Sequence, residues 1–379
     1  MAHSKAVVVA DLGSSGFKLI YLSARGRPGV VLMPPEFGLI AAHHLDQRLD
    51  SYGEDPQRSA YVTTGNGIYA AGEFARDALV VQYHEFSKWH DLTLKVLIIL
   101  GLIKELTGQP DSFSASLGLL LPRAEATVTN RGDRIDEIKR VAAAGFYFRD
   151  SAEPICCDLE LTLFTEGSGM FFCHSAALRS QGRFSSKMDV PIVMGGERNT
   201  SLTYFQRGQL STKRSNSNGP HFYEVAESVR KTIGADVPLH TLISAIARGQ
   251  SQFRYPGLMP IDISAATEKG LDAYYQSMTR YLRAQMPVEN VSVCGCGGAL
   301  WLIWERLQGW FENELQIPAV YLNQPLKAEL KNILAGDPNF DLIRNPDNPL
   351  RFADAYGIYQ VLVSQARQSA QRSTSKIAA

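Results

Sequence analysis

Three short apolar segments, far apart in the sequence, each run directly into a turn rich in glycine. They are AVVVAD (residues 6–11), VPIVM (190–194) and the short segment 291–293. A continuous apolar run of this length, bounded by turn residues, is typical of a strand buried on both faces. We therefore expect an α/β protein in which several buried strands end at glycine turns.

The two halves of the chain share one plan. In each half the buried strand and its turn are followed by a second strand, at residues 17–22 and 200–205, so each pair is predicted to form a β-hairpin. Helices follow, predicted at residues 87–106, 131–144, 223–232, 239–248, 263–284, 299–315 and 353–370. The halves join near residues 181–189. This is a repeat of architecture, because no period is visible in the sequence itself.

The first turn lies in DLGSSGFK (residues 11–18) and is the strongest functional signal. Its four central residues are Gly13, Ser14, Ser15 and Gly16. Glycines here let backbone N–H groups approach an anion closely, Lys18 can neutralise phosphate charge, and Asp11 can hold Mg²⁺ through water. The alternative is an ordinary hairpin turn, in which glycine supplies positive φ and Lys18 is an unrelated surface side chain.

The other two turns repeat this signal. The second is MGGERNTS (residues 194–201), at the equivalent place in the second half. The third is CGCGGA (residues 294–299), which follows a strand and leads into a helix. A glycine cluster at such a junction presents backbone amides and the positive end of a helix to a phosphate or ribose.

Composition limits the classes of function. The chain has 379 residues, with 38 Lys plus Arg and 38 Asp plus Glu, so its formal net charge is zero. This balance argues against a surface devoted to nucleic acid or membrane. The apolar run at the N-terminus is too short for a signal peptide, and residues 96–103 are too few to cross a bilayer. Five cysteines without metal spacing predict free thiols in a cytoplasmic protein and no zinc site.

The order of the three turns resembles that in the superfamily of actins, heat-shock chaperones and sugar kinases. In that superfamily a D-x-G-x-x-x-x-K hairpin, a D-x-G-x-x-T hairpin and a G-G-x-A turn surround ATP. The first motif is matched by Asp11, Gly13 and Lys18. The third is matched by Gly297, Gly298 and Ala299, which lack the residue that the superfamily has between the second glycine and the alanine.

Further segments extend the resemblance over nearly the whole chain. Residues 86–106 occupy the place of the first interdomain helix, and PLRFADAYG (349–357) resembles the segment that begins the last one. The compact size and YVTTGNGIYAAGEFA (61–75) are most similar to the bacterial plasmid-segregation actins, the ParM/StbA group. The resemblance implies a bilobal α/β fold of the ribonuclease H-like type with the nucleotide in the interdomain cleft. It implies lobe I at 1–187 closed by a helix at 352–370, lobe II at 188–351, and a flexible tail at 371–379.

The second hairpin departs from the superfamily pattern. Met194 stands where the superfamily has Asp, and Asn199 where it has the first Thr. Backbone donors remain at Gly195 and Gly196, and Thr200 keeps a hydroxyl. Methionine is at best a soft ligand and cannot organise Mg²⁺ or an attacking water. Nucleotide binding is therefore favoured over fast hydrolysis.

Three further residues receive roles from the resemblance. Glu166 lies in the loop where the superfamily places a residue that positions water, and its carboxylate can act as a general base. The alternative is a solvated loop glutamate. Glu227 and Lys231 would border the adenine by their place in the superfamily, although a surface salt bridge between residues four apart on a helix is the simpler explanation of the pair.

The resemblance implies an ATP-binding protein, with ADP as product and Mg²⁺ as cofactor, that polymerises head to tail and hydrolyses ATP slowly. Its implied cellular use is plasmid or DNA partition through a DNA-binding adaptor, without direct contact to nucleic acid or membrane. GTP remains an alternative to ATP. Two rival functions stay open: a small-molecule kinase, whose ATP turnover would depend on an added acceptor, and a nucleotide-binding scaffold that does not hydrolyse.

Overall fold

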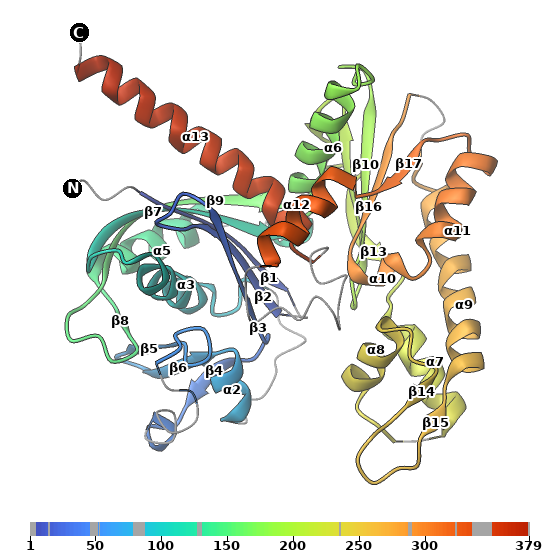
Figure 1. Cartoon of the computed structure of the whole chain (residues 1–379), viewed down its shortest axis with the longest axis horizontal. Helices are drawn as coiled ribbons and strands as arrows, with labels where there is room; N and C mark the ends of the chain where they lie inside the picture. The colour runs from blue at the N-terminus through green and yellow to red at the C-terminus, as the bar shows by residue number, and fades with distance from the viewer. Residues whose placement is uncertain are drawn as a thin grey trace. The chain divides into compact units, whose positions relative to one another are not determined.

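The chain divides into two compact units (Figure 1). Unit 1 comprises Met1–Thr165 with Asp354–Ala379, and unit 2 comprises Glu166–Ala353. The sequence prediction divided the chain at residue 187, whereas the computed structural model divides it before helix α6 (Ser168–Ser180), which packs on strands of unit 2. The structure describes residues 5–13, 16–45, 52, 54–78, 88–126, 131–234, 236–286, 290–322, 324–335 and 351–377.

Unit 1 is built on a five-stranded sheet in the order β3-β2-β1-β7-β9. Its strands are β1 (Ala6–Gly13), β2 (Gly16–Leu22), β3 (Pro28–Met33), β7 (Ser112–Leu121) and β9 (Cys156–Thr165). Strand β1 pairs antiparallel with β2 and parallel with β7. Residues 6–10 of β1 are all buried, as expected for a continuous apolar run covered on both faces.

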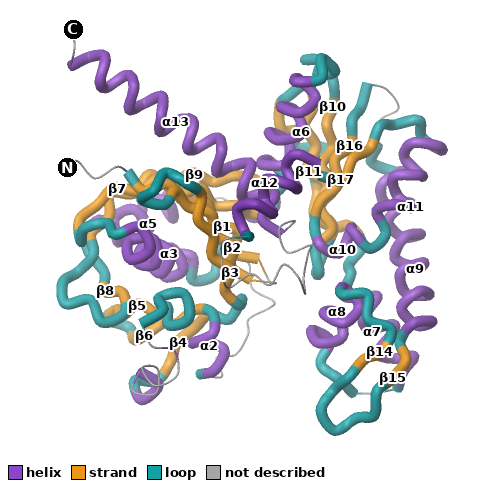
Figure 2. Tube along the Cα trace, in the orientation of Figure 1, coloured by secondary structure: helices purple, strands orange, loops and turns teal. Residues whose placement is uncertain are grey.

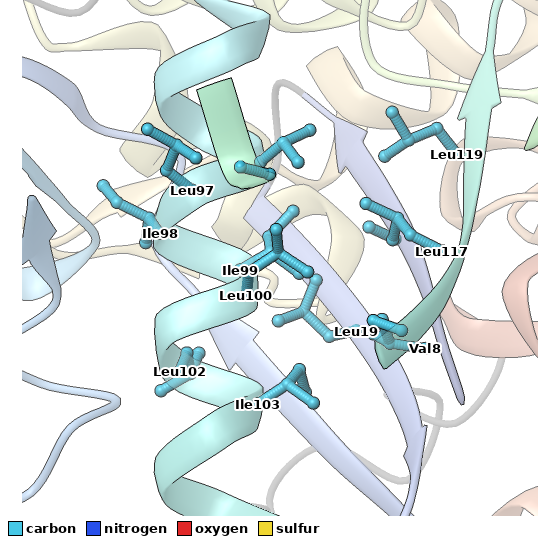
Figure 3. Packing of buried hydrophobic residues seen from close by; sticks show 14 of the residues in the cluster. Val8, Leu19, Leu97, Ile98, Ile99, Leu100, Leu102, Ile103, Leu117 and Leu119 are labelled. Carbon is cyan, nitrogen blue, oxygen red and sulfur yellow. The ribbon is translucent and has the colours of Figure 1, made fainter. Parts of the chain in front are cut away.

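Helices cover both faces of this sheet. On one face α3 (Leu92–Thr107) packs against the sheet, and Figure 3 shows Ile99 and Ile103 pointing toward Val8 and Leu19. The same apolar cluster includes residues of α5 (Arg131–Ala144). Side chains of α13 (Ala353–Ile377) reach the sheet at Gly118, and a short helix, α4 (Arg123–Ala126), follows β7.

A smaller antiparallel sheet completes unit 1, in the order β4-β6-β5-β8 (Figure 2). Its elements are β4 (Phe37–Ile40), β5 (Tyr61–Thr64), β6 (Gly67–Ala71), β8 (Tyr147–Phe148) and the adjoining helix α2 (Glu73–Asp77). Phe148 is completely buried and lies over Gly101 of α3, where a side chain would occupy the space of its ring. The small sheet is thus held to α3 by a contact that needs glycine.

Unit 2 repeats the topology of unit 1, with the order β12-β11-β10-β16-β17. Its strands are β10 (Asp189–Gly195), β11 (Thr200–Gln206), β12 (Gln209–Leu210), β13 (Asn216–Gly219), β16 (Val293–Cys296) and β17 (Ala319–Tyr321). Like β1, the central strand β10 pairs antiparallel with the next strand and parallel with a distant one, β16. The repeat of architecture expected from the sequence is therefore present as a repeat of strand order and direction.

Helices cover both faces of this sheet as well. Gly167, at the start of α6, lies against Ile192, while the neighbouring Val193 belongs to the apolar core on the other face. Buried His174 of α6 hydrogen-bonds Ser292 at 2.9 Å between Nε2 and Oγ, and burial lowers the pKa of His174 to about 4. The remaining elements are α7 (Tyr223–Ile233), α8 (Leu239–Ala247), β14 (Gln252–Phe253), β15 (Ile261–Asp262), α9 (Ser264–Arg283), α10 (Gly298–Trp301), α11 (Trp304–Gly309) and α12 (Gln324–Leu334).

Three predicted helices differ from those observed. Helix α3 begins at Leu92, not at residue 87. The helix predicted over 299–315 is broken into α10, α11 and a π-helical turn (Trp310–Glu314). The last helix runs to Ile377, so the predicted tail from residue 371 is helical that far, because residues 366–377 contain neither glycine nor proline. Among the described residues, no helix combines the length and apolar character needed to span a membrane.

We predict that Gly101→Ala destabilises the protein although alanine favours helix. A Cβ at residue 101 would lie 2.2 Å from the Phe148 ring, and overpacking of a core costs about 1–3 kcal/mol, which exceeds the gain of about 1 kcal/mol in helix propensity. The matched control is Gly132→Ala in α5, where no atom lies within 4 Å of the new methyl. Urea unfolding of both variants checks this, and a Gly101→Ala variant at least as stable as Gly132→Ala would contradict it.

Candidate functional site

The first glycine turn closes the β1–β2 hairpin of unit 1. Gly13 and Gly16 are paired across the turn. Asp11, two residues before Gly13, lies directly opposite Lys18, two residues after Gly16. Lys18 Nζ donates to Asp11 Oδ2 at 2.6 Å. A Cβ on Gly13 would lie 3.1 Å from Lys18 Nζ, so glycine at this position lets the ammonium lie close to the backbone of the turn. Ser14 and Ser15, predicted to take part, lie outside the described residues.

A second lysine, which the sequence analysis missed, meets the same carboxylate. Lys88 Nζ donates to Asp11 Oδ1 at 2.6 Å and to the carbonyl oxygen of Leu120 at 3.1 Å. Leu120 lies in register with Asp11 on the neighbouring strand β7. Lys88 therefore spans the carboxyl ends of the two central strands. No local motif marks this residue, because it lies 77 positions from Asp11.

The three charged groups make the turn electropositive. Both ammonium side chains are 10% exposed and the Asp11 side chain 19% exposed. Burial alone would raise the pKa of Asp11, but the ammonium groups of Lys18 and Lys88 outweigh it and hold that pKa well below its usual value. Two cations and one anion leave a local charge of +1 beside glycine backbone. Such a turn is suited to an anion of the phosphate type.

In unit 2 the other two glycine turns are packed against each other. Gly195 ends β10, and a Cβ there would lie 2.7 Å from Cβ of Leu300. Gly297 has φ 94° and precedes α10, and a Cβ there would lie 2.3 Å from the carbonyl oxygen of Gly195. Gly298 is exposed, whereas Ala299 is buried in the core. The predicted third motif is thus mainly a close backbone contact, and Gly298 is its exposed part.

Side chains of the β10–β11 turn are occupied by hydrogen bonds inside unit 2. Thr200 is completely buried, and its hydroxyl donates to the carbonyl oxygen of Pro220 at 2.9 Å. The Asn199 amide donates to the carbonyl oxygen of Ser217 at 3.1 Å, and Gly196 N–H donates to the carbonyl oxygen of Asn199 at 2.9 Å. Thr200 therefore holds the hairpin to the following segment, a structural role that the superfamily pattern did not anticipate.

Glu166 begins unit 2 and is fixed through its backbone. Its carbonyl oxygen accepts a hydrogen bond from Thr203 Oγ1 of β11 at 2.6 Å, and its side chain is half-buried. Gly167 follows with φ 91°, and its Cα faces Thr203. The loop that carries Glu166 is therefore hydrogen-bonded to β11, the strand that follows the β10–β11 turn. This placement is compatible with the general-base role expected for Glu166, which stays a prediction.

The two residues assigned to the adenine do not pair with each other. Glu227 Oε1 lies 3.9 Å from Arg230 Nη2, one turn along α7, and Lys231 is exposed. The first turn of α7 is tied to the β10–β11 turn, because Tyr223 N–H donates to the carbonyl oxygen of Glu197 at 2.9 Å. Glu227 and Lys231 thus lie on a helix anchored at the second glycine turn, and their adenine role stays a prediction.

A nucleotide and a magnesium ion fit these residues differently. The electropositive β1–β2 turn of unit 1 and the exposed Gly298 of unit 2 offer donors suited to phosphate. For Mg²⁺ the fit is poor, because both carboxylate oxygens of Asp11 already accept hydrogen bonds from ammonium groups. Within the described part of the chain, no three His, Cys, Asp or Glu side chains gather where they could hold a metal ion.

Comparison with known proteins gives matches by structure alone. No family model matches the sequence, and no curated protein matches it. The crystal structure of the actin-like protein Alp7A superposes with a TM-score of 0.67 at 14% identity, covering 98% of this chain and 99% of that one. A 15-stranded ParM filament from Clostridium botulinum gives 0.61 at 15% identity, covering 96% and 100%. The archaeal actin homolog Ta0583 gives 0.63 at 14% identity, covering 96% and 99%.

The chain has an actin-like fold. The fold class predicted from the sequence, a bilobal α/β fold of the actin and ribonuclease H-like type, is thereby confirmed. Because the identities are so low, the likeness concerns the arrangement of the chain. The two repeated sheets, each with a glycine turn after its central strand, are the part of the actin-like fold on which the candidate site is built.

We predict that Gly297→Ala disrupts the contact between the two turns of unit 2. A residue with a side chain at φ 94° costs about 1–3 kcal/mol in backbone strain alone, and its Cβ would overlap the carbonyl oxygen of Gly195. Gly298→Ala is the matched control, since no atom lies within 4 Å of its new methyl, and we expect a change within about 0.5 kcal/mol. Urea unfolding compares them, and equal effects would argue against a structural contact at Gly297.

Proposed function

We propose that this protein is an actin-like, ATP-binding protein that polymerises head to tail into filaments. The observation that carries the proposal is the electropositive β1–β2 turn, in a chain whose fold matches a ParM filament protein over 96% of its length. In the cell we propose a cytoplasmic role in plasmid or DNA segregation. A net charge of zero gives the chain little attraction for DNA, so the link would be a DNA-binding adaptor protein.

The chain's own residues would bind and orient the phosphates. At the β1–β2 turn, the glycine backbone of Gly13 and Gly16 and the ammonium groups of Lys18 and Lys88 would hold phosphate oxygens. Gly298 would add a backbone donor. ATP supplies a terminal phosphoryl group that is lost on hydrolysis, and Glu166 would accept the proton of the attacking water.

A binding difference between ATP and ADP would control assembly. Head-to-tail contacts between identical subunits use two different surfaces and generate open filaments when the rotation does not close a ring. A ligand shifts such an equilibrium only by its differential affinity for the two states. The zero net charge also keeps repulsion between copies low.

A second candidate function is favoured by Met194. This residue is the last but one of β10, where the superfamily has Asp, and its thioether can neither hold Mg²⁺ nor orient water. A nucleotide-binding scaffold that assembles without hydrolysis is therefore the alternative. It shares the proposed binding site and differs in phosphate release.

Assembly is tested by sedimentation and negative-stain electron microscopy with ATP, ADP, GTP or no nucleotide. We expect filaments with ATP. Lys18→Met should abolish the response, because it removes a cation from the turn. Lys104→Met should retain it, because the Lys104–Asp111 ion pair lies at the end of α3. Absence of assembly with every nucleotide would refute the filament proposal.

Hydrolysis is tested by substituting Met194. We expect Met194→Asp to raise the rate of phosphate release about tenfold or more, because a carboxylate at the end of β10 can orient and polarise water. Met194→Asn, which adds a polar group without charge, is the control and should change the rate much less. Phosphate release is followed in single-turnover assays. An unchanged rate in Met194→Asp would show that this position does not face the terminal phosphate.

A further inference from the structure

The charge arrangement around Asp11 goes beyond the superfamily pattern. That pattern assigns one lysine to the first turn and leaves the Asp available for Mg²⁺ through water. Here each oxygen of the carboxylate accepts a hydrogen bond from a different ammonium, Oδ2 from Lys18 and Oδ1 from Lys88, both at 2.6 Å. Charge-assisted hydrogen bonds of this length, with all three side chains mostly buried, are strong.

Lys88 is held rigidly in this position. Besides Asp11, its ammonium binds the carbonyl oxygen of Leu120 on β7. The residue after it, Trp89, is buried and donates from Nε1 to the carbonyl oxygen of Glu125 at 2.6 Å. Lys88 is therefore followed directly by a residue that is anchored to α4. Since an ammonium carries three N–H donors, it can bind Asp11 and a phosphate oxygen together.

Magnesium bound directly to Asp11 would have to displace these contacts. Mg²⁺ demands near-octahedral oxygen ligands and is usually held by one or two carboxylates together with phosphate and water. A contact through water would leave the bonds of Asp11 to Lys18 and Lys88 in place. The ion would then share the turn with two ammonium groups, which repel it. At the end of β10, Met194 offers sulfur, which Mg²⁺ does not favour.

We infer that Lys18 and Lys88 together supply the positive charge that phosphate needs at the β1–β2 turn, so that this protein binds its nucleotide without requiring Mg²⁺. Asp11 then serves as a positioning residue that holds the two ammonium groups side by side. The inference rests on the proposed function, since it concerns the same nucleotide. It adds a second phosphate-binding cation, Lys88, and a different requirement for metal.

The test is calorimetric titration of the full-length protein with ADP and with ATP, in Mg²⁺ and in EDTA. We expect the dissociation constants in the two conditions to agree within about threefold. The loss of one charged hydrogen bond would change the dissociation constant by more than that. Nucleotide binding in Mg²⁺ that is lost in EDTA would overturn the inference and leave the proposed function intact. Absence of binding in both conditions would refute the proposed function itself.

Substitution of Lys88 gives a second, independent readout. Lys88→Met should weaken binding in EDTA about 10-fold or more, by loss of one charged hydrogen bond. It should also make the remaining binding respond to Mg²⁺, because Oδ1 of Asp11 is released. Lys88→Arg should restore most of the affinity, and Lys104→Met should behave as the unsubstituted protein.

Unchanged affinity in a Lys88→Met variant that unfolds normally would overturn the role of Lys88. If that variant does not fold, the comparison of Mg²⁺ with EDTA in the unsubstituted protein decides alone.

Discussion

The position of every candidate residue depends on the way the two central strands are held. Each of β1 and β10 pairs antiparallel with the strand that follows it and parallel with a strand from much later in the unit. Both are covered by helices or apolar side chains on their two faces. A strand held on all four sides keeps its register, because a slip by one residue would move each side chain to the other covered face, where the packing does not fit it. The strand residues that border the turn at its carboxyl end are therefore fixed as well.

The same construction carries different chemistry in the two units. In unit 1 the turn gathers two lysines around one aspartate, so its character is electrostatic. In unit 2 the corresponding turn is closed by glycine against glycine, and its hydroxyl and amide groups bind the unit's own backbone. Unit 1 therefore supplies charge, while unit 2 supplies a rigid surface with an exposed backbone at Gly298.

Sequence reasoning predicted the hairpins, because their contacts are local. Asp11 and Lys18 are seven residues apart in the first hairpin, and the ion pair between them was not predicted, because each had been given a separate role. The repeated strand and turn pattern predicted the repeat of architecture, and the resemblance to the actin superfamily implied the bilobal fold. Lys88 was missed because its contact with Asp11 depends on the path of a distant segment. The hydrogen bond from Thr200 to the segment after β13 was not expected, because burial by that segment leaves no mark in the hairpin sequence.

Helix boundaries show the same limit. One helix was expected over 299–315, since its apolar periodicity is unbroken, yet the chain leaves helical geometry at Ile303. The Trp304 ring lies where a side chain at Gly295 would be, so the chain bends to bring the indole onto the sheet. Packing on β16, which the apolar pattern of the helix does not reveal, explains that bend.

The return of the last helix has a consequence for synthesis. Ile358 and Leu362 of α13 cover β7 at Gly118, so unit 1 is built from both ends of the chain, whereas unit 2 is one continuous stretch. As the chain leaves the ribosome, unit 2 has all of its residues before unit 1 does. The sheet of unit 1 keeps apolar residues such as Val9 uncovered until the final helix emerges. A truncated product lacking α13 would expose that face of the sheet.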